Sequence, residues 1–516
     1  MRRRTMLQAN HRKTKEAIRI SLEVHAMGAS LLLRATRSAR YVGVLRALII
    51  CASLVSLVIP TAAQTSYARD RVYTADQISN TVSVVDPATN RLLGIIRLGD
   101  PFIAGLSPLY KGALLVHGLG FSPDGRTLAV VSIGSNSVTL IDTASNRVKG
   151  VVYVGRSPHE AFFTPDGREL WVAVRGENYI SVIDPVQMKE LRRITTVDGP
   201  GMVLFRPDGK YAFVPSSFTP TLCVIDVQRH EVVAKVEQAS PFSPNLAVSS
   251  DGREVWFTLK DVGRTQVISA DPPFRTLAVL DTGPITNHVF LLENEKGRFA
   301  YITVGGTNEV KVYRRGTAPT LVATIQTGDL PHGIWGSPDG KRVYIGLENG
   351  DAVQVIDTLQ NRIVATIPVG QLPQALVYVP NAALTSTGAE NLAPLDEAAQ
   401  RLHVALASTS DGKGRATVVV NSLGLVDHLQ IAAAGLAPNA EYSLQLVSKD
   451  RRETPTTLVK FKTNASGSAI AQTIGPIKSL LTAMPRGIHP ERELVLVSAG
   501  DGRTALVQSG PASSRR

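Results

Sequence analysis

The chain has 516 residues, of which 44% are hydrophobic and 19% are charged, and this composition excludes an intrinsically disordered protein. Its two cysteines are too few for a disulfide framework. The formal net charge is +12, but residues 64–516 hold 44 basic and 41 acidic residues, so at +3 they lack the positive charge typical of nucleic-acid-binding proteins.

Residues 1–63 are predicted to be a basic leader that ends in a secretory signal peptide. Basic residues as late as Arg46 precede an uncharged apolar run over 47–59, and small residues up to Ala63 follow it. This order is that of a signal peptide, cleaved here after Ala63. The run is shorter than the roughly 20 residues that a membrane-spanning helix needs, so an uncleaved anchor is the alternative. We expect a periplasmic or secreted protein that contacts a membrane only if the leader is retained.

A turn motif recurs along residues 70–382. Its form is Ser-Pro-Asp-Gly or a close variant, and its acidic residue is Asp124, Asp166, Asp208, Asp251 and Asp339. The steps between these residues are 42, 42, 43 and 88, and the last is two periods of 44. Proline fits the second position of a type I turn and glycine fits its last position, so each copy is predicted to reverse the chain. A second motif, Val or Ile followed by Asp, keeps the same period at Asp86, Asp142, Asp184, Asp226 and Asp357.

Each period is predicted to hold four short antiparallel strands, because β-rich runs such as Thr139-Leu140-Ile141 lie between the turns. Four strands in a repeat of this length are typical of one blade of a β-propeller. The strand before the turn occurs seven times, near residues 117–122, 159–164, 201–206, 244–249, 288–293, 332–337 and 373–379. The repeat begins on its second strand, at Val72-Tyr73, and ends on its first. The two ends are therefore expected to share a blade and close a seven-bladed ring, which removes exposed sheet edges.

The last full unit carries the most complete set of motifs. They are Leu330-Pro331-His332-Gly333, Ser337-Pro338-Asp339-Gly340, Tyr344-Ile345-Gly346, Val355-Ile356-Asp357 and the run Val364-Ala365-Thr366-Ile367-Pro368-Val369-Gly370. In these motifs the repeat resembles the YVTN family of β-propellers, also called the surface-layer or lactonase-like propeller group, over residues 70–382. The resemblance implies a propeller fold and an envelope or secreted location. It does not specify a reaction, because propellers host many functions.

Histidines recur at one position of the strand that leads to the turn. Seven residues before the turn Asp lie His117, His159 and His332, and the corresponding positions of irregular units hold His288, Gln374 and Asn245. Since this strand lines the axial channel of a propeller, these side chains are expected to meet at one mouth of the channel. Arg156 and Glu160 come from the same loops. These eight residues are the candidate ligand-binding residues.

Four of these candidates are also candidate metal ligands, namely His117, His159, His288 and His332. Convergent imidazoles suit copper or zinc. They also suit an anion, or a general base near neutral pH. The remaining alternative is that the histidines only hydrogen-bond to neighbouring blades and fill the channel.

The loop over residues 101–112 breaks the repeat, because the step from Asp86 to Asp142 is 56 residues. It joins the last strand of one blade to the first strand of the next, on the side of the histidines. An apolar insertion there is predicted to be a lid or a partner-binding loop, and a surface insertion without function is the alternative.

Residues 383–400 are small and polar and are predicted to be a linker. From 401 to 516, strand-like runs such as Ala416-Thr417-Val418-Val419-Val420 alternate with turns such as Asp501-Gly502. This pattern predicts a small C-terminal β-sandwich. The whole protein is therefore expected to be all-β.

No catalytic residue is predicted, since the sequence has no nucleophile elbow, P-loop, zinc-protease motif or haem-attachment cysteine pair. The favoured function is an exported, non-enzymatic binding or scaffold propeller of the cell envelope. It would need no cofactor and would hold a protein or a small molecule at the histidine mouth. The alternatives are a metal-binding or lactonase-like hydrolytic propeller that uses the histidines, and single-stranded nucleic-acid binding, which the charge of +3 argues against.

Overall fold

The computed structural model describes residues 67–98, 114–395, 401–408, 412–423, 426–450, 453–477, 482–484, 487–488 and 492–510. The predicted leader and the insertion over 101–112 lie outside the described residues. Strands make up nearly all of the regular structure, together with the 3-10 helix η1 (Gly305–Thr307). No helix in the described part of the chain has the length and apolar character needed to cross a membrane.

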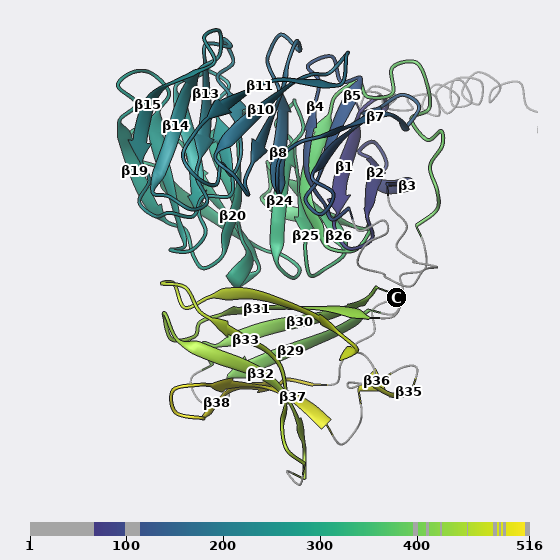
Figure 1. The fold of residues 1–516 in the computed structure, drawn as a ribbon, viewed down its shortest axis with the longest axis vertical. Coiled ribbons are helices and arrows are strands. Elements are labelled where there is room, and N and C mark those ends of the chain that lie inside the picture. Colours follow the sequence, from purple (N-terminus) through teal and green to yellow (C-terminus); the bar gives the residue numbers. More distant parts are fainter. Residues whose placement is uncertain are drawn as a thin grey trace, which may run out of the picture. The chain divides into compact units, whose positions relative to one another are not determined.

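Seven four-stranded antiparallel sheets form a β-propeller (Figure 1). From the innermost strand outward, the first three blades are β28 (Pro373–Val379), β1 (Arg71–Asp76), β2 (Thr81–Asp86) and β3 (Arg91–Arg97); β4 (Val116–Phe121), β5 (Thr127–Ser132), β6 (Ser137–Asp142) and β7 (Arg147–Tyr153); and β8 (Pro158–Phe163), β9 (Leu170–Val174), β10 (Tyr179–Asp184) and β11 (Lys189–Thr195). The fourth and fifth are β12 (Leu204–Phe205), β13 (Tyr211–Pro215), β14 (Thr221–Asp226) and β15 (Glu231–Glu237); and β16 (Leu246–Val248), β17 (Glu254–Leu259), β18 (Arg264–Ser269) and β19 (Thr276–Asp281). The last two are β20 (Thr286–Asn294), β21 (Gly297–Val304), β22 (Glu309–Arg314) and β23 (Thr320–Gln326); and β24 (Pro331–Gly336), β25 (Arg342–Leu347), β26 (Ala352–Asp357) and β27 (Arg362–Pro368). The predicted seven-bladed propeller is confirmed.

The ring closes through a blade that both ends of the propeller segment share. β28 pairs antiparallel with β1, from Arg71 opposite Val379 to Asp76 opposite Pro373. The Asp70 carboxylate strengthens this closure, because it accepts hydrogen bonds from the Tyr378 hydroxyl at 2.5 Å and the Asn381 backbone N–H at 2.8 Å. The predicted closure is therefore confirmed, and it leaves no innermost strand unpaired.

The turn motif works through its side chains as the sequence indicates. In the second blade, the Ser122 hydroxyl donates to Asp124 Oδ1 at 2.5 Å, and the Arg126 backbone N–H donates to the same oxygen at 3.0 Å. Gly125 has a φ of +70°, a region that side chains with a Cβ rarely adopt. The same hydrogen bond from the hydroxyl to the Asp recurs in the third, fifth and seventh blades, where it stabilises the turn between the innermost strand and the second one.

Large side chains of the second strands pack between the blades. Trp171 on β9 and Trp256 on β17 are fully buried. Their indole N–H groups donate to Glu169 at 2.8 Å and Glu254 at 2.9 Å, which satisfies the polar edge of each ring. Interlocking of this kind gives the innermost strands a rigid support.

The C-terminal domain is all-β, as predicted, and its main strands belong to one eight-stranded antiparallel sheet (Figure 1, green to yellow). The order across the sheet is β33 (Thr456–Lys462), β32 (Glu441–Ser448), β37 (Arg492–Ser498), β38 (Thr504–Gln508), β29 (Leu402–Ser408), β30 (Arg415–Ser422), β31 (Asp427–Ala434) and β34 (Ala469–Gly475). The sheet is nearly closed, because its end strands β33 and β34 lie close together. It encloses an apolar core that includes Val418, Leu429 and Leu496. β35 (Thr482–Met484) and β36 (Gly487–Ile488) pair separately.

The segment between the two β domains binds along the propeller. The side-chain amide of Asn146 donates to the Gly388 and Glu390 carbonyls at 3.2 and 2.9 Å, and Ile95 forms a β-bridge with Ala393. The described part of the predicted linker, up to residue 395, therefore contacts the first two blades.

The propeller and the C-terminal sheet belong to one compact unit and share polar contacts. Arg401 pairs with Asp351 at 2.5 Å, and His403 pairs with Asp329 at 2.8 Å. Each of these pairs joins the first strand of the C-terminal sheet to a propeller loop on the side where the innermost strands begin.

Candidate functional site

Four histidines enter the channel from the innermost strands of four blades. His117 lies on β4, His159 on β8, His288 on β20 and His332 on β24, and each residue is at most 9% exposed. In each case the pairing with the second strand shifts register at the histidine, as in a β-bulge. A bulge re-aims a side chain, so the same irregularity accompanies every one of these imidazoles.

The four imidazoles form one cluster. The Nε2 atoms of His117 and His159 are 2.8 Å apart, and the ring centroids of His288 and His332 are 4.8 Å apart. The ring centroids of His117 and His332 lie 6.4 Å apart and join the two pairs. The structure brings together the four histidines that occupy corresponding positions of the repeat. Their role in binding stays a prediction.

A chain of hydrogen bonds determines which nitrogens of His117 and His159 carry protons. The Gly201 carbonyl lies 2.6 Å from His159 Nδ1, and a carbonyl only accepts, so this Nδ1 must donate. In a neutral ring His159 Nε2 then accepts from His117 Nε2, and His117 Nδ1 accepts from the Gln77 amide at 3.2 Å. Both rings are therefore fully engaged as neutral imidazoles.

Burial keeps these imidazoles uncharged. It lowers the pKa of His117, His159 and His288 well below the usual value for histidine. Positive charge lowers these pKa values further, from Arg175 at His117 and His159 and from Lys260 at His117 and His288. A negatively charged ligand in this region would oppose the effect of the two cations.

Glu348 links His332 to the C-terminal sheet. Its Oε2 accepts a hydrogen bond from His332 Nδ1 at 2.6 Å, and its Oε1 accepts one from the Gln430 amide on β31 at 2.8 Å. Gln430 also donates to Asn349 Oδ1 at 2.9 Å. Burial by itself would raise the pKa of Glu348, but His332, Lys260 and the Gln430 amide outweigh it and hold this pKa below its usual range. Glu348 is thus a buried carboxylate that orients His332.

A cavity of about 550 Å³ lies beside this cluster, and we call it the histidine end of the channel. It is lined by His117, His159, His332, Gln374, Gln77, Glu348, Arg175 and Lys260, and also by residues of the C-terminal sheet such as Lys462 and Gln472.

Arg175 and Lys260 place positive charge in this cavity. The Arg175 guanidinium lies 5.1 Å from the ring centroid of Phe242, and its Nε has no hydrogen-bond partner. Burial lowers the pKa of Lys260 to about 8, so this side chain is mostly charged at neutral pH. Within the described ranges, neither cation forms an ion pair with a carboxylate.

The remaining sequence candidates are distributed differently. Gln374 lines the histidine end, whereas His288, Asn245 and Glu160 line a second cavity of the channel. Arg156 lines neither cavity, because its guanidinium is exposed and donates to the Gly176 carbonyl at 2.7 Å. The structure therefore does not place Arg156 with the other candidates.

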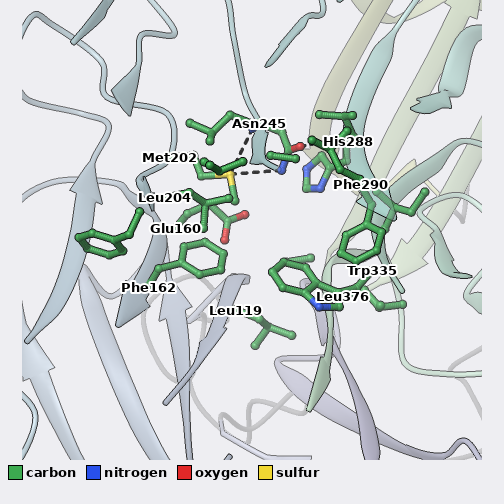
Figure 2. Close-up of a pocket in the computed structure, with 18 residues that line it drawn as sticks. Leu119, Glu160, Phe162, Met202, Leu204, Asn245, His288, Phe290, Trp335 and Leu376 are labelled. Carbon is green, nitrogen blue, oxygen red and sulfur yellow. Dashed lines mark hydrogen bonds between the residues drawn. The ribbon is translucent and has the colours of Figure 1, made fainter. Parts of the chain in front are cut away.

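The second cavity, of about 210 Å³, lies further along the innermost strands, and we call it the aromatic end. Figure 2 shows Phe162, Phe290 and Trp335 around it, with the Glu160 carboxyl pointing into the space between them. Asn245 donates to Met202 Sδ at 3.2 Å on the same wall (Figure 2).

Four residues of the histidine end were missed by sequence reasoning, namely Gln77, Arg175, Lys260 and Glu348. Each directly follows the second strand of its blade, after β1, β9, β17 and β25 respectively. The second strand runs antiparallel to the innermost strand, so it ends where the histidines begin. A charged or amide side chain directly after a buried second strand was the available signal.

Metal binding by the histidines stays a prediction. In the part of the chain that the structure describes, no group of three or more His, Cys, Asp or Glu side chains is arranged to hold a metal ion. The hydrogen bond between His117 and His159 engages the two Nε2 atoms that would be the ligands of such an ion.

Comparison with known families identifies the propeller. Residues 163–367 match the model of the family described as the YNCE-like beta-propeller. The propeller is of the YncE type. This match confirms the resemblance drawn from the repeat motifs. It extends from the end of β8 in the third blade to β27 in the seventh blade. A comparison with curated proteins finds no match.

A comparison with solved structures finds similar chains. A functionally unknown protein from Desulfotomaculum acetoxidans is 12% identical, with a TM-score of 0.51 over 60% of this chain and 98% of its own. The periplasmic gluconolactonase PpgL from Pseudomonas aeruginosa is 21% identical, with a TM-score of 0.47 over 60% and 99% of the two chains. Hydrazine synthase from Kuenenia stuttgartiensis is 21% identical, with a TM-score of 0.45 over 60% and 95%. At these identities a likeness extends to the fold alone.

Proposed function

We propose that the protein binds a small organic anion, such as a carboxylate, at the histidine end of the channel, as a non-enzymatic binding protein of the cell envelope. The observation that carries the proposal is that Arg175 and Lys260 share one cavity and neither forms an ion pair within the described ranges. A buried charge is costly unless it is paired, so an anion in the cavity would stabilise both cations.

The size and lining of the cavity suit such a ligand. Its volume of about 550 Å³ lies within the range of roughly 300 to 1,000 Å³ that small-molecule sites occupy. The guanidinium of Arg175 can hold a carboxylate with two hydrogen bonds, and its Nε has no hydrogen-bond partner among the described residues. The amides of Gln77 and Gln374 line the same cavity and can position the rest of the molecule.

The cellular location is the second part of the proposal. The leader over residues 1–63 has the composition of a secretory signal peptide. YncE-like propellers are often periplasmic, which agrees with export. Fractionation of cells that express the full chain, with detection of a product that begins after Ala63, tests this part.

Calorimetric titration with succinate and citrate tests the binding site. We expect both anions to bind the wild-type protein, and Arg175→Met or Lys260→Met to weaken binding on the order of tenfold. Arg168→Met is the matched control, because Arg168 belongs to the same blade as Arg175 and its side chain is 85% exposed. Equal affinity in the wild type and both cavity variants would overturn the proposal.

The same protein preparation separates the alternatives. If the wild-type protein contains stoichiometric copper or zinc that is lost on substitution of His117 and His159, the site binds a metal and not an anion. Hydrolysis of a lactone that stops on the same substitutions would establish an enzyme. Neither result is expected if the histidine end binds an anion only.

A further inference from the structure

The aromatic end of the channel contains an isolated buried acid. Glu160 is 3% exposed, and the Leu119 backbone N–H on β4 donates a hydrogen bond to its carboxylate. The carboxyl fits there because Gly118 has no side chain, since a Cβ at that position would lie 2.8 Å from Glu160 Oε2. The innermost strand of the second blade, β4, thus leaves space for an acid on the innermost strand of the third blade, β8.

Burial is the main electrostatic influence on this acid. Burial raises the pKa of Glu160 well above its usual value, and no charged side chain of the described residues offsets the effect. Among the described residues that line this cavity, His288 on β20 is the other titratable side chain, and burial lowers its pKa well below the usual value. Burial therefore favours the uncharged forms of both side chains.

Aromatic rings surround the space in front of Glu160. Phe162 lies nearly parallel to Trp335 at 6.1 Å between ring centroids, and Phe290 lies 5.5 Å from Trp335 (Figure 2). Phe290 and Trp335 are partly exposed, whereas Glu160 lies deeper. The cavity of about 210 Å³ has room for roughly seven water molecules or one small organic group.

A carboxyl at the base of an aromatic cavity is chemistry that recognises an organic cation. The faces of aromatic rings attract cations through their quadrupole, most strongly where water is excluded. Alkyl groups on the cation would contact the apolar walls formed by Met202 and Leu204. We propose that the aromatic end binds a small organic ammonium ion, with Glu160 as its counterion and Phe162, Phe290 and Trp335 as its walls.

Choline and its uncharged isostere 3,3-dimethylbutan-1-ol test this proposal, since they share a shape and differ in charge. We expect choline to bind the wild-type protein at least tenfold more tightly than the isostere. Glu160→Gln should weaken choline binding on the order of tenfold and leave the isostere unchanged. Trp335 is the only one of three tryptophans in the cavity, so its fluorescence reports binding there, and Trp335→Phe removes that signal.

Proton release is a second readout that a merely structural Glu160 would not give. Because Glu160 must be ionised to act as the counterion, choline binding should release protons, and calorimetry in two buffers of different ionisation enthalpy measures their number. Glu160→Gln should release none. If that variant fails to fold, Trp335→Leu keeps the acid and should still weaken choline while it preserves proton release.

Three results would overturn the proposal: no saturable choline binding at alkaline pH, equal affinity for choline and its isostere, or full affinity in Glu160→Gln. The outcome is independent of the anion proposed at the histidine end. Arg175→Met should weaken anion binding there on the order of tenfold and leave choline binding unchanged, so failure of one site is distinguishable from failure of the other.

Discussion

The histidine end and the aromatic end of the channel are built from the same innermost strands but present opposite chemistry. The histidine end uses the first residues of those strands, the residues after the second strands and a contact from Gln430, and Arg175 and Lys260 add positive charge to it. The aromatic end uses the later residues of the strands and holds one carboxyl among rings. Position along a strand therefore decides which chemistry a repeat can carry.

This difference shows how a repeat protein separates fold from function. The turn residues, such as Ser122 and Asp124, hold each blade through local hydrogen bonds. Side chains between the turns face the channel and are free to differ from blade to blade. Because stability comes from the turns and from packing between blades, each end of the channel can hold groups that burial makes costly.

Glu348→Ala should have the largest effect on the unfolding free energy and would disrupt the hydrogen-bond network of the histidine end. It removes the carboxylate that accepts from both His332 and Gln430, and loss of one member of a buried charged network costs about 3 kcal/mol of unfolding free energy. Urea unfolding followed by circular dichroism measures the change. Glu348→Gln keeps a hydrogen-bonding amide and should lose less. An unchanged unfolding free energy in the alanine variant would contradict a stabilising network.

Glu160→Gln should raise the unfolding free energy, whereas Glu348→Ala lowers it, and would sharpen the contrast between the two ends of the channel. Because burial raises the pKa of Glu160, the folded protein keeps a proton that the unfolded chain releases, so this acid favours folding only at low pH. The glutamine variant should match the wild type near pH 4. It should gain stability as the pH rises above the pKa of a carboxyl in the unfolded chain, by up to about 1.4 kcal/mol per pH unit. Thermal unfolding across this range checks the slope, and a pH-independent difference would refute it.

His159→Gln should have the smallest effect, and it tests the histidine end through the pH dependence of the unfolding free energy. Because burial lowers the pKa of His159, the unfolded chain takes up a proton below about pH 6.5 that the folded protein does not, so the wild type loses stability as the pH falls. Between about pH 6.5 and 5.5 the variant should lose about 1 kcal/mol less than the wild type. His230→Gln is the control, because His230 pairs with Glu169 outside the channel. If the stability of His159→Gln fell with decreasing pH as steeply as that of the wild type, His159 would not be neutral and buried in the folded protein.

Much of the site followed from the register of the repeat. Counting back from Asp124, Asp166 and Asp339 selected His117, His159 and His332, and the structure places these rings in one cluster. Arg156 was grouped with them because it lies in the same loop, but loops allow a side chain to turn outward, and this one binds the Gly176 carbonyl. Arg175 and Lys260 were missed because the second strand was treated as structural.

The amino-acid sequence by itself determined the blades, since a turn depends on neighbouring residues and a period of 42 to 44 can be counted. It also determined the closure of the ring, because the unit begins on its second strand and ends on its first. Only the tertiary structure decided which side chains share a cavity. The tautomer of His159 and the contact of Glu348 with Gln430 depend on segments that are far apart in the chain, and no local pattern encodes distances between them.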